Sequence, residues 1–240
     1  MLFLILGKGK TGSLVAEVAL ERGHSVRALD IEENRNAAAL NAAGLAGVDA
    51  VIDFTAPEAA VENMTAVLAC GSRIVVGTTG WYAHLDEMKA LAAEHGGALL
   101  YGTNFSMGVQ KLFRLTAELA RLDGYTFHIA ETHHVTKLDA PSGTAITLRE
   151  IIQATQPEFL PSAGPGSFVP NPSNKVEITS HRIADAKGEH VVTASSETDT
   201  LEIRHDAHSR RGFALGAVRA AEWVAGKTGA WEFREIFDQL

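Results

Sequence analysis

The chain has 240 residues, of which 46% are apolar and 21% are charged, and its formal net charge is −8. This length and composition are typical of a globular protein with one large domain or two smaller ones. The acidic balance, without clustered Lys and Arg, argues against a protein that grips nucleic acid. The apolar run at 2–6 is too short for a secretory signal or a membrane span, so we expect a cytoplasmic protein with no membrane partner. The one cysteine, Cys70, excludes an intrachain disulfide, and its apolar surroundings predict a buried thiol.

A strand, a glycine-rich turn and a helix are predicted at the start of the chain. Residues 2–6 (LFLIL) are continuously apolar, which is typical of a strand buried on both faces of a parallel sheet. The turn GKGKTG follows, and SLVAEVALERG after it has the pattern of an amphipathic helix. In a dinucleotide-binding turn one glycine forms the tight turn, one lets the pyrophosphate approach, and one lets the helix pack on the strand. We therefore expect cofactor contacts at this turn, from Gly7, Lys8, Gly9, Lys10, Thr11 and Gly12.

An acidic residue, Asp30, follows the second predicted strand, SVRAL. An acid in this position can bind the ribose hydroxyls of NAD. Because Ile31 stands where an arginine could grip a 2′-phosphate, the sequence favours NADH over NADPH, although Lys8 and Lys10 could still reach a phosphate. The alternative for Asp30 is an ordinary turn or helix-capping residue.

Strands and helices continue to alternate through the first hundred residues. Strands are predicted at 49–54, 73–76 and 98–101, and helices at 57–69 and 82–95. This alternation predicts a doubly wound parallel sheet, whose ligands bind beyond the carboxyl ends of the strands. Polar residues at those ends indicate the rim of a nucleotide cleft, and the candidates for cofactor contacts there are Thr55, Gly77, Thr78, Thr79, Thr103, Asn104 and Phe105.

The pattern changes near residue 106. A helix is predicted from Ser106 to about residue 122, a strand at 125–131, and a helix from Ser142 to about residue 154. After a proline-rich loop at 157–172, three runs read as strands without intervening helices: KVEITSHRI, EHVVTASS and TLEIRHDA. Together these elements predict a mixed sheet with accompanying helices.

Two domains are expected from this change. The first is an α/β Rossmann-like domain with a doubly wound parallel sheet, formed by residues 1–106 and 209–240. It includes the tail because the apolar helix predicted at 209–225 cannot bury its face alone. The second, residues 107–208, is a smaller α+β domain with a mixed open sheet. We expect the first domain to bind the dinucleotide.

The segment ETHHVTKLDAPSGTA, residues 131–145, gathers proton-transfer groups. If the preceding strand runs through His133 and His134, their side chains point to opposite faces, so both can serve one site only if the strand ends at or before them. Lys137 follows in the loop. These three side chains suit a site that binds an anion and supplies a proton.

A helix start follows in the same segment. Ser142 suits the N-cap position. The N–H groups of Gly143 and Thr144 would then lie unpaired at the positive end of the helix, which makes a pocket for a carboxylate or phosphate. The alternative is a polar loop with a capped helix. A metal site is not expected, because adjacent histidines rarely reach one metal and the pair His205 and His208 reads as a solvated strand end.

The segment resembles the signature E-x-HH-x-x-K-x-DAPSGTA of the dihydrodipicolinate reductase family, also named 4-hydroxy-tetrahydrodipicolinate reductases. The glycine turn and four further stretches match this family in the expected order: VIDFTAPE, VVGTTG, TNFSMGV and HSRRGFALGAVRAA. The resemblance implies reduction of 4-hydroxy-tetrahydrodipicolinate (dihydrodipicolinate) to tetrahydrodipicolinate with NADH or NADPH, in lysine and diaminopimelate biosynthesis. A hydride would go to C4 and a proton to C3.

Site roles also follow from the resemblance. It implies that His133 or Lys137 supplies the proton, and that His134, Gly143 and Thr144 bind the dicarboxylate substrate. Gly102 joins the cofactor contacts, and the second domain's sheets would join a homotetramer.

Two other functions stay open from the residues alone. An amino-acid dehydrogenase could use the same two-domain plan, although the DAPSGTA run argues against it. A non-enzymatic NAD sensor would usually carry a basic DNA-binding domain, which this acidic chain lacks.

Overall fold

A computed structural model describes residues 1–156, 176–184 and 186–240. The predicted proline-rich loop at 157–172 therefore lies outside the described residues. Among the helices that the structure describes, none is both long enough and apolar enough to cross a bilayer.

The first compact unit of the chain comprises Met1–Met107 and Arg210–Leu240. It holds a six-stranded sheet in the order β10-β5-β4-β3-β1-β2, and every neighbouring pair in it is parallel. This sheet confirms the predicted Rossmann-like α/β fold. Its strands are β1 (Leu2–Leu6), β2 (Ser25–Leu29), β3 (Ala50–Asp53), β4 (Arg73–Val76), β5 (Ala98–Tyr101) and β10 (Gly229–Glu232).

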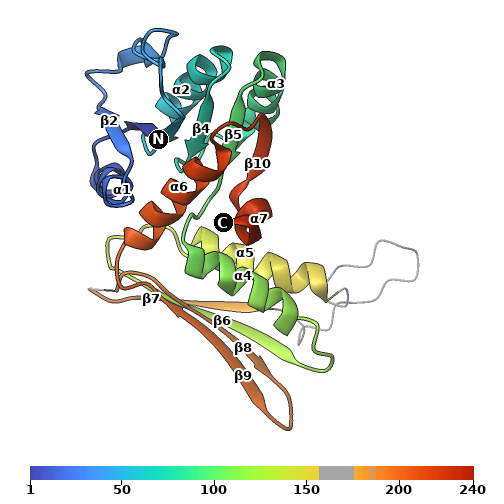
Figure 1. Cartoon of the computed structure of the whole chain (residues 1–240). Coiled ribbons are helices and arrows are strands. Elements are labelled where there is room, and N and C mark those ends of the chain that lie inside the picture. The colour runs from blue at the N-terminus through green and yellow to red at the C-terminus, as the bar shows by residue number, and fades with distance from the viewer. Residues whose placement is uncertain (157–175, 185) are drawn as a thin grey trace. The chain divides into compact units, whose positions relative to one another are not determined.

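Helices cover both faces of this sheet (Figure 1). Phe3 and Ile5 of β1 belong to the core beneath α1 (Lys10–Glu21) and α6 (Arg211–Val224). The alternate residues of β1 belong to the opposite core, beneath α2 (Pro57–Ala69) and α3 (Leu85–His95). The continuous apolar run at the start of the sequence therefore reflects burial on both faces.

Three details of this unit differ from the sequence predictions. Strand β10, which pairs with β5, was not predicted. The helix predicted at 82–95 begins as a separate 3₁₀ turn, η2 (Tyr82–His84), before α3. Cys70 follows the last turn of α2 and is exposed, so the prediction of a buried thiol was wrong. The remaining short elements are η1 (Arg35–Ala37), α7 (Phe233–Ile236) and η5 (Phe237–Gln239).

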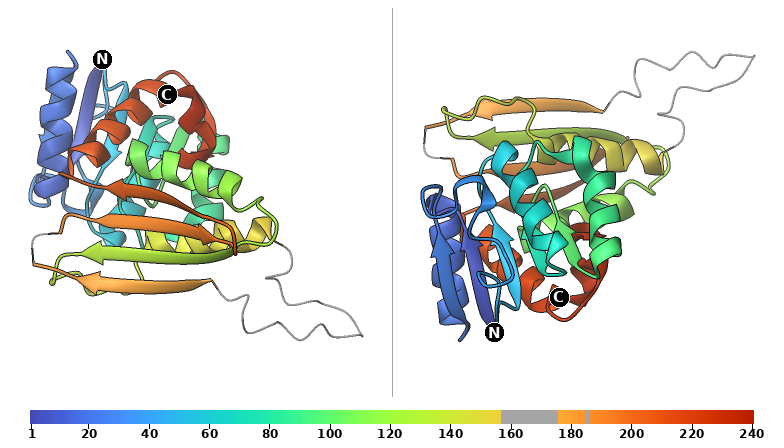
Figure 2. Two further views of the ribbon diagram at one scale, coloured as in Figure 1. Left: turned by 90° about the horizontal axis from the view of Figure 1, so that it is seen from below. Right: turned by 90° about the horizontal axis from the view of Figure 1, so that it is seen from above.

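The second compact unit, Gly108–Ser209, contains a four-stranded sheet in the order β7-β6-β8-β9. The pair β6–β7 is parallel and the other two pairs are antiparallel, which confirms the predicted mixed sheet (Figure 2). Helices α4 and α5 lie on one face of this sheet, where Phe113, Ile129 and Leu148 share a core. The bounds are α4 (Met107–Leu119), β6 (Thr126–His133), α5 (Gly143–Thr155), β7 (Glu177–Arg182), β8 (Glu189–Ser195) and β9 (Thr200–Asp206).

Strand β6 extends two residues beyond its predicted end at residue 131. Its pairing with β7 continues as far as His133, which lies opposite Arg182. Because side chains alternate along a strand, Glu131 and His133 point to the same face. The length of β6 therefore decides which residues of the predicted site meet.

Candidate active site

The three glycines of the first turn have three different surroundings. Gly7 has φ +94°, a conformation that favours glycine. A Cβ added to Gly12 would lie 1.8 Å from the carbonyl oxygen of Gly7, so α1 and β1 can approach this closely only without a side chain. A Cβ at Gly9 would meet nothing within 4 Å, and Gly9 is the N-cap of α1 without a side-chain cap. The turn thus presents open backbone at a helix N-terminus, which fits a dinucleotide pyrophosphate.

A cleft of about 480 Å³ lies beside this turn. It brings together residues that follow β1, β3 and β4, as expected for the carboxyl edge of a parallel sheet. A Cβ at Gly77 would lie 2.2 Å from the Phe54 ring, so this glycine leaves the space that the ring occupies. The lining consists of Gly9, Lys10, Thr11, Phe54, Thr55, Pro57, Gly77, Thr78 and Thr79.

Asp53 does not line this cleft but holds two of its lining residues, Thr55 and Thr78, and it was not among the predicted site residues. Its carboxylate is fully buried and accepts hydrogen bonds from the hydroxyls of Thr55 (2.7 Å) and Thr78 (2.8 Å). It also accepts one from the side-chain amide of Asn63, at 2.7 Å. The two threonine hydroxyls are thus directed into the protein, where they hold the loops after β3 and β4 together.

A second cleft, of about 600 Å³, is lined by Asp30 and Ile31 beside the glycine turn. Asp30 Oδ1 accepts the backbone N–H groups of Glu32 (3.0 Å) and Glu33 (3.1 Å), so this residue does act in a turn, as the alternative interpretation held. Its Oδ2 lies 3.5 Å from Lys8 Nζ. The second oxygen is therefore placed where it can meet a ligand or the lysine.

Lys8 pairs mainly with Glu33 at the edge of the second cleft. The hydrogen bond with Glu33 raises the pKa of Lys8, and the same contact lowers the pKa of Glu33. The pKa of Asp30 is also lowered, first by the backbone hydrogen bond from Glu33 and then by the charge of Lys8. Two carboxylates thus surround Lys8, and Arg35, the other cation that lines this cleft, pairs with Glu32.

The predicted contacts after β5 are not brought into either cleft: Gly102, Thr103, Asn104 and Phe105 are absent from both linings. The Phe105 side chain is only 2% exposed and packs on Phe233, with ring centroids 4.5 Å apart. Asn104 Oδ1 accepts the backbone N–H of Ser106 at 2.9 Å. The aromatic ring serves the core, so a ligand contact at this strand end would have to use other groups.

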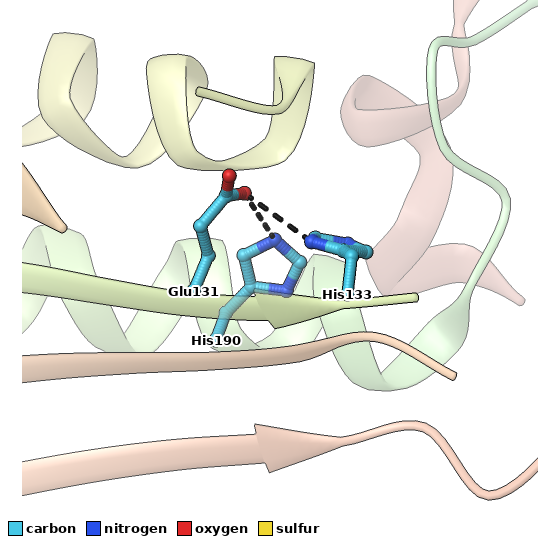
Figure 3. Close-up of side chains that lie close together, drawn as sticks. All are labelled: Glu131, His133 and His190. Atoms are coloured by element: carbon cyan, nitrogen blue, oxygen red, sulfur yellow. Dashed lines mark ion pairs between the residues drawn. The ribbon is translucent and has the colours of Figure 1, made fainter. Parts of the chain in front are cut away.

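In the second unit, Glu131, His133 and His190 converge beneath the start of α5 (Figure 3). His133 Nδ1 lies 3.5 Å from Glu131 Oε2, and His190 Nε2 lies 3.7 Å from the same oxygen. The imidazole rings are edge-on, with centroids 5.1 Å apart. All three side chains are buried. His190 reaches the site because β8 pairs with β6 in a register that sets it opposite Glu131.

Three donor groups converge on the Glu131 carboxylate. The backbone N–H of Ser142 lies 3.1 Å from each oxygen, and the Ser180 hydroxyl donates to Oε1 at 2.8 Å. The Arg182 guanidinium approaches Oε1 at 3.4 and 3.5 Å. Burial raises the pKa of Glu131, but the hydrogen bonds from Ser142 and Ser180 outweigh it and the net shift is downward. The group is therefore a buried carboxylate.

The pKa values of both buried histidines are lowered from the usual value for an imidazole. Burial lowers the pKa of His190 to about 4, and the neighbouring His133 adds to this shift. The pKa of His133 is also lowered, chiefly by burial, although the charge of Glu131 opposes the change. His190 Nε2 lies 3.2 Å from the Ser142 hydroxyl. This contact joins the pair of rings to the N-cap of α5.

The other predicted substrate residues lie around this cluster rather than in it. Lys137 Nζ binds both carboxylate oxygens of Asp139, at 2.7 and 2.8 Å. His134 follows the end of β6, and its Nδ1 lies 2.7 Å from the Thr136 hydroxyl. Only His133 of the two adjacent histidines joins the buried cluster, in line with the alternation along the strand.

The predicted N-cap is present at α5. Ser142 accepts the backbone N–H of Ala145 at 3.2 Å, and a Cβ at Gly143 would meet nothing within 4 Å. Gly143 and Thr144 form the first turn, with no acidic residue there. The Cβ side of Gly143 is therefore open to a ligand, while the N–H of Ser142 is already bonded to Glu131.

A cation could also be considered at Glu131, His133 and His190, whose ligand atoms lie within 4.8 Å of one another. A carboxylate and two imidazoles are a donor set that Zn²⁺ accepts. Adjacency in sequence did not suggest this set, because His190 comes from another strand. The contacts of Arg182 and Ser142 already balance the Glu131 charge, so a divalent ion would compete with a cation in place.

Comparisons with known proteins cover nearly the whole chain. Residues 2–105 match the family described as dihydrodipicolinate reductase, N-terminus, and residues 108–237 match dihydrodipicolinate reductase, C-terminus. The chain is 34% identical to a 4-hydroxy-tetrahydrodipicolinate reductase of Christiangramia forsetii, with 98% of this chain and 97% of the relative covered. It is 37% identical to one of Natronomonas pharaonis, with 93% and 94% covered.

Solved structures show the same fold at lower identity. A dipicolinate-bound dihydrodipicolinate reductase from Paenisporosarcina sp. TG-14 aligns with a TM-score of 0.78 and 22% identity, covering 100% of this chain and 99% of that one. An amine dehydrogenase from Mycobacterium smegmatis aligns with a TM-score of 0.65 and 12% identity, covering 98% and 95%. At 22% and 12% identity, these likenesses show a shared fold alone.

Proposed function

Because the chain belongs to the dihydrodipicolinate reductase family, we infer that it reduces 4-hydroxy-tetrahydrodipicolinate (dihydrodipicolinate) to tetrahydrodipicolinate with a nicotinamide cofactor. This step belongs to lysine and diaminopimelate biosynthesis. The observation that carries the proposal is the buried His133 near the N-terminus of α5 (Figure 3). One provides a proton-transfer group, and the other provides backbone N–H groups for an anionic substrate.

We propose that the first unit holds the cofactor. The open backbone at Gly9 and the N-terminus of α1 face the pyrophosphate, and Asp30 Oδ2 meets the ribose. Gly77 and the backbone of Thr78 and Thr79 line the adjoining cleft. When bound, the cofactor supplies the hydride that is added at C4. The chain's own task in this unit is to orient the ring and to hold the pyrophosphate.

We propose that the second unit, with His133 as the acid, binds the dicarboxylate and supplies the proton. Gly143 and Thr144 at the start of α5 address a carboxylate through the helix dipole and backbone N–H groups. Lys137, held by Asp139, is a further carboxylate partner once the ion pair opens. His133, whose ring is buried beside a carboxylate, is the better proton source, and His134 contacts the substrate from the loop.

NADH is the preferred cofactor in this proposal. A 2′-phosphate would enter the cleft that Asp30 and Glu32 line, and both carboxylates would repel it. The two cations that line this cleft are already paired, Lys8 with Glu33 and Arg35 with Glu32. Ile31 is 75% exposed and offers no charge.

A homotetramer is the proposed assembly, joined through the second unit's sheet. The described helices of this unit lie on one face of the sheet, which leaves the opposite face available to other copies (Figure 2). Sedimentation velocity tests this directly, since a monomer at micromolar concentration would contradict it.

The most informative test of the reaction is a coupled assay. The substrate is generated enzymatically from pyruvate and aspartate semialdehyde, the protein is added, and the loss of NADH and NADPH is followed separately. We expect rapid oxidation that depends on the generated substrate, with NADH favoured. Oxidation of amino acids by NAD⁺ without reductase activity would instead support the amino-acid dehydrogenase alternative.

A further inference from the structure

The surroundings of His133 contain a contact that the proposed reaction does not yet explain. Its Nδ1 atom is buried and has no hydrogen-bond partner among the described residues. The nearest carboxylate oxygen, Glu131 Oε2, lies 3.5 Å away on the same face of β6. A charge-assisted N–H···O bond spans about 2.7–2.9 Å, so a shift of less than about 1 Å would close this one.

The other ring nitrogen has different surroundings. A Cβ added to Gly188 would lie 3.3 Å from His133 Nε2, so the absence of a side chain there leaves this edge of the ring uncovered. Gly188 has φ +137°, which side-chain-bearing residues rarely adopt. The ring therefore has Nδ1 facing a buried carboxylate and Nε2 facing Gly188.

We propose that Glu131 is the positioning residue of His133: its carboxylate holds the Nδ1–H of the imidazole, and Nε2 is thereby the nitrogen that delivers the proton. This inference rests on the proposed role of His133. It deepens that role by fixing the tautomer and the direction of transfer. After the Nε2–H bond breaks and the proton leaves for C3, the ring remains neutral with its proton on Nδ1.

Glu131 suits this task because three donor groups stabilise its carboxylate in the ionised form. Ser142, Ser180 and Arg182 come from α5 and β7, and each donates to the carboxylate. A carboxylate with these donors stays ionised when a histidine beside it gains or loses a proton. Ser142 is also the N-cap of α5. The same residue therefore contacts Glu131, which positions His133, and begins the helix proposed to bind the anion.

The charged groups around His133 set its pKa, and the pH dependence of kcat would report that pKa. Removing the Glu131 charge leaves the desolvation and the neighbouring cations, which lower the pKa of His133 further. The protonated form would then be lost at lower pH, so the alkaline limb of the kcat profile moves to lower pH. The ionisable groups facing the ring are Glu131, Lys137, Asp139, Arg182 and His190.

The test compares Glu131→Gln with a matched control, Glu118→Gln, an exposed residue of α4. We expect Glu131→Gln to lower kcat by about 10²-fold, the lower end of what a positioned general acid contributes. Its alkaline limb should move to lower pH, while KM for NADH stays the same. Glu131→Asp, which retains the charge, should restore much of the limb's position. The control should change none of these quantities.

Two measurements keep the inference falsifiable. In the His133→Gln background, Glu131→Gln should add little further loss, because one residue acts through the other. A full additional loss, or an unmoved pH limb in the single variant, would overturn it. If His133→Gln alone retains turnover, the proposed function's acid is wrong, which is a different failure. If Glu131→Gln does not fold, ¹⁵N NMR of the wild-type protein can show which nitrogen of neutral His133 carries the proton. A proton on Nε2 rather than Nδ1 in the neutral ring would contradict the proposal.

Discussion

The glycine turn at residues 7–12 and the segment from Glu131 to Thr144 are built on one plan with opposite chemistry. Each joins the end of a strand to the N-terminus of a helix, and each keeps a glycine, Gly9 or Gly143, without neighbours at its Cβ position. The first presents uncapped backbone and no buried ionisable group in the turn. The second has a serine cap and a buried carboxylate with two histidines. A bound phosphate needs only the uncapped backbone of a helix start. An anion that must also receive a proton needs, in addition, a buried proton-transfer group beside the helix start.

The largest expected effect separates chemistry from cofactor binding. His133→Gln should lower kcat by about 10²–10⁴-fold, the contribution of a positioned general acid. The Kd of NADH, measured by fluorescence titration, should stay the same because the variant leaves the glycine turn intact. Near-normal turnover would remove His133 from the acid role. A weakened Kd of NADH would break the division of tasks between the two regions.

A second prediction concerns the stability of the buried histidines. The folded-state pKa of His190, about 4, lies below its unfolded value, so the unfolded chain binds more protons as pH falls from about 6.5 to 4. Denaturant unfolding should show a loss of roughly 3 kcal/mol from this group across that window. The groups facing it are Glu131, His133, His205 and Lys137.

His190→Gln should flatten this pH dependence. His84→Gln, an exposed histidine in the first unit, should leave it unchanged. An equally steep loss of unfolding free energy in His190→Gln would show that the acid sensitivity lies elsewhere.

A matched pair of substitutions tests the division within the glycine turn. Gly12→Ala would place a Cβ 1.8 Å from a backbone oxygen, and we expect it to cost about 1–3 kcal/mol or more of unfolding free energy. Gly9→Ala meets no atom of the chain and should leave Tm nearly unchanged, yet raise the Kd of NADH by about tenfold. Tight NADH binding by Gly9→Ala would place the pyrophosphate elsewhere.

The smallest expected effect sharpens cofactor choice. Glu33→Gln frees Lys8 from its ion pair, so kcat/KM for NADPH relative to NADH should rise by up to about fivefold, as is usual for an exposed pair. Adding Lys8→Ala should abolish the gain. A gain that persists without Lys8 would mean that removing the carboxylate's repulsion is the whole effect.

The parallel sheet could be predicted from sequence because burial on both faces leaves continuous apolar runs such as LFLIL. Strand β10 (GAWE) carries no such run. Its residues are only half-buried at the edge of the sheet, and it forms because β5 offers a partner edge. An edge strand of this kind has no local signal.

Part of the candidate site could be read from local sequence and part could not. Ser142 is visible as an N-cap and His133 as one of a histidine pair. Ser180 and His190 were missed because they meet Glu131 only through the register of β7 and β8 with β6. Phe105 was predicted from its strand-end position, but its apolar ring favours the core. The roles of the predicted cofactor and substrate residues stay predictions.

The late position of β10 and α6 in the chain affects how the protein is made. Strand β10 completes the edge of the first sheet beside β5, and α6 packs against α1, although about two hundred residues separate the two helices in the chain. During synthesis the second unit emerges whole, whereas the first waits for residues 210–240, and until then the part of its sheet that α6 covers stays exposed. We expect the inserted unit to fold first on the ribosome, and the nascent first unit to be the one that needs chaperone protection.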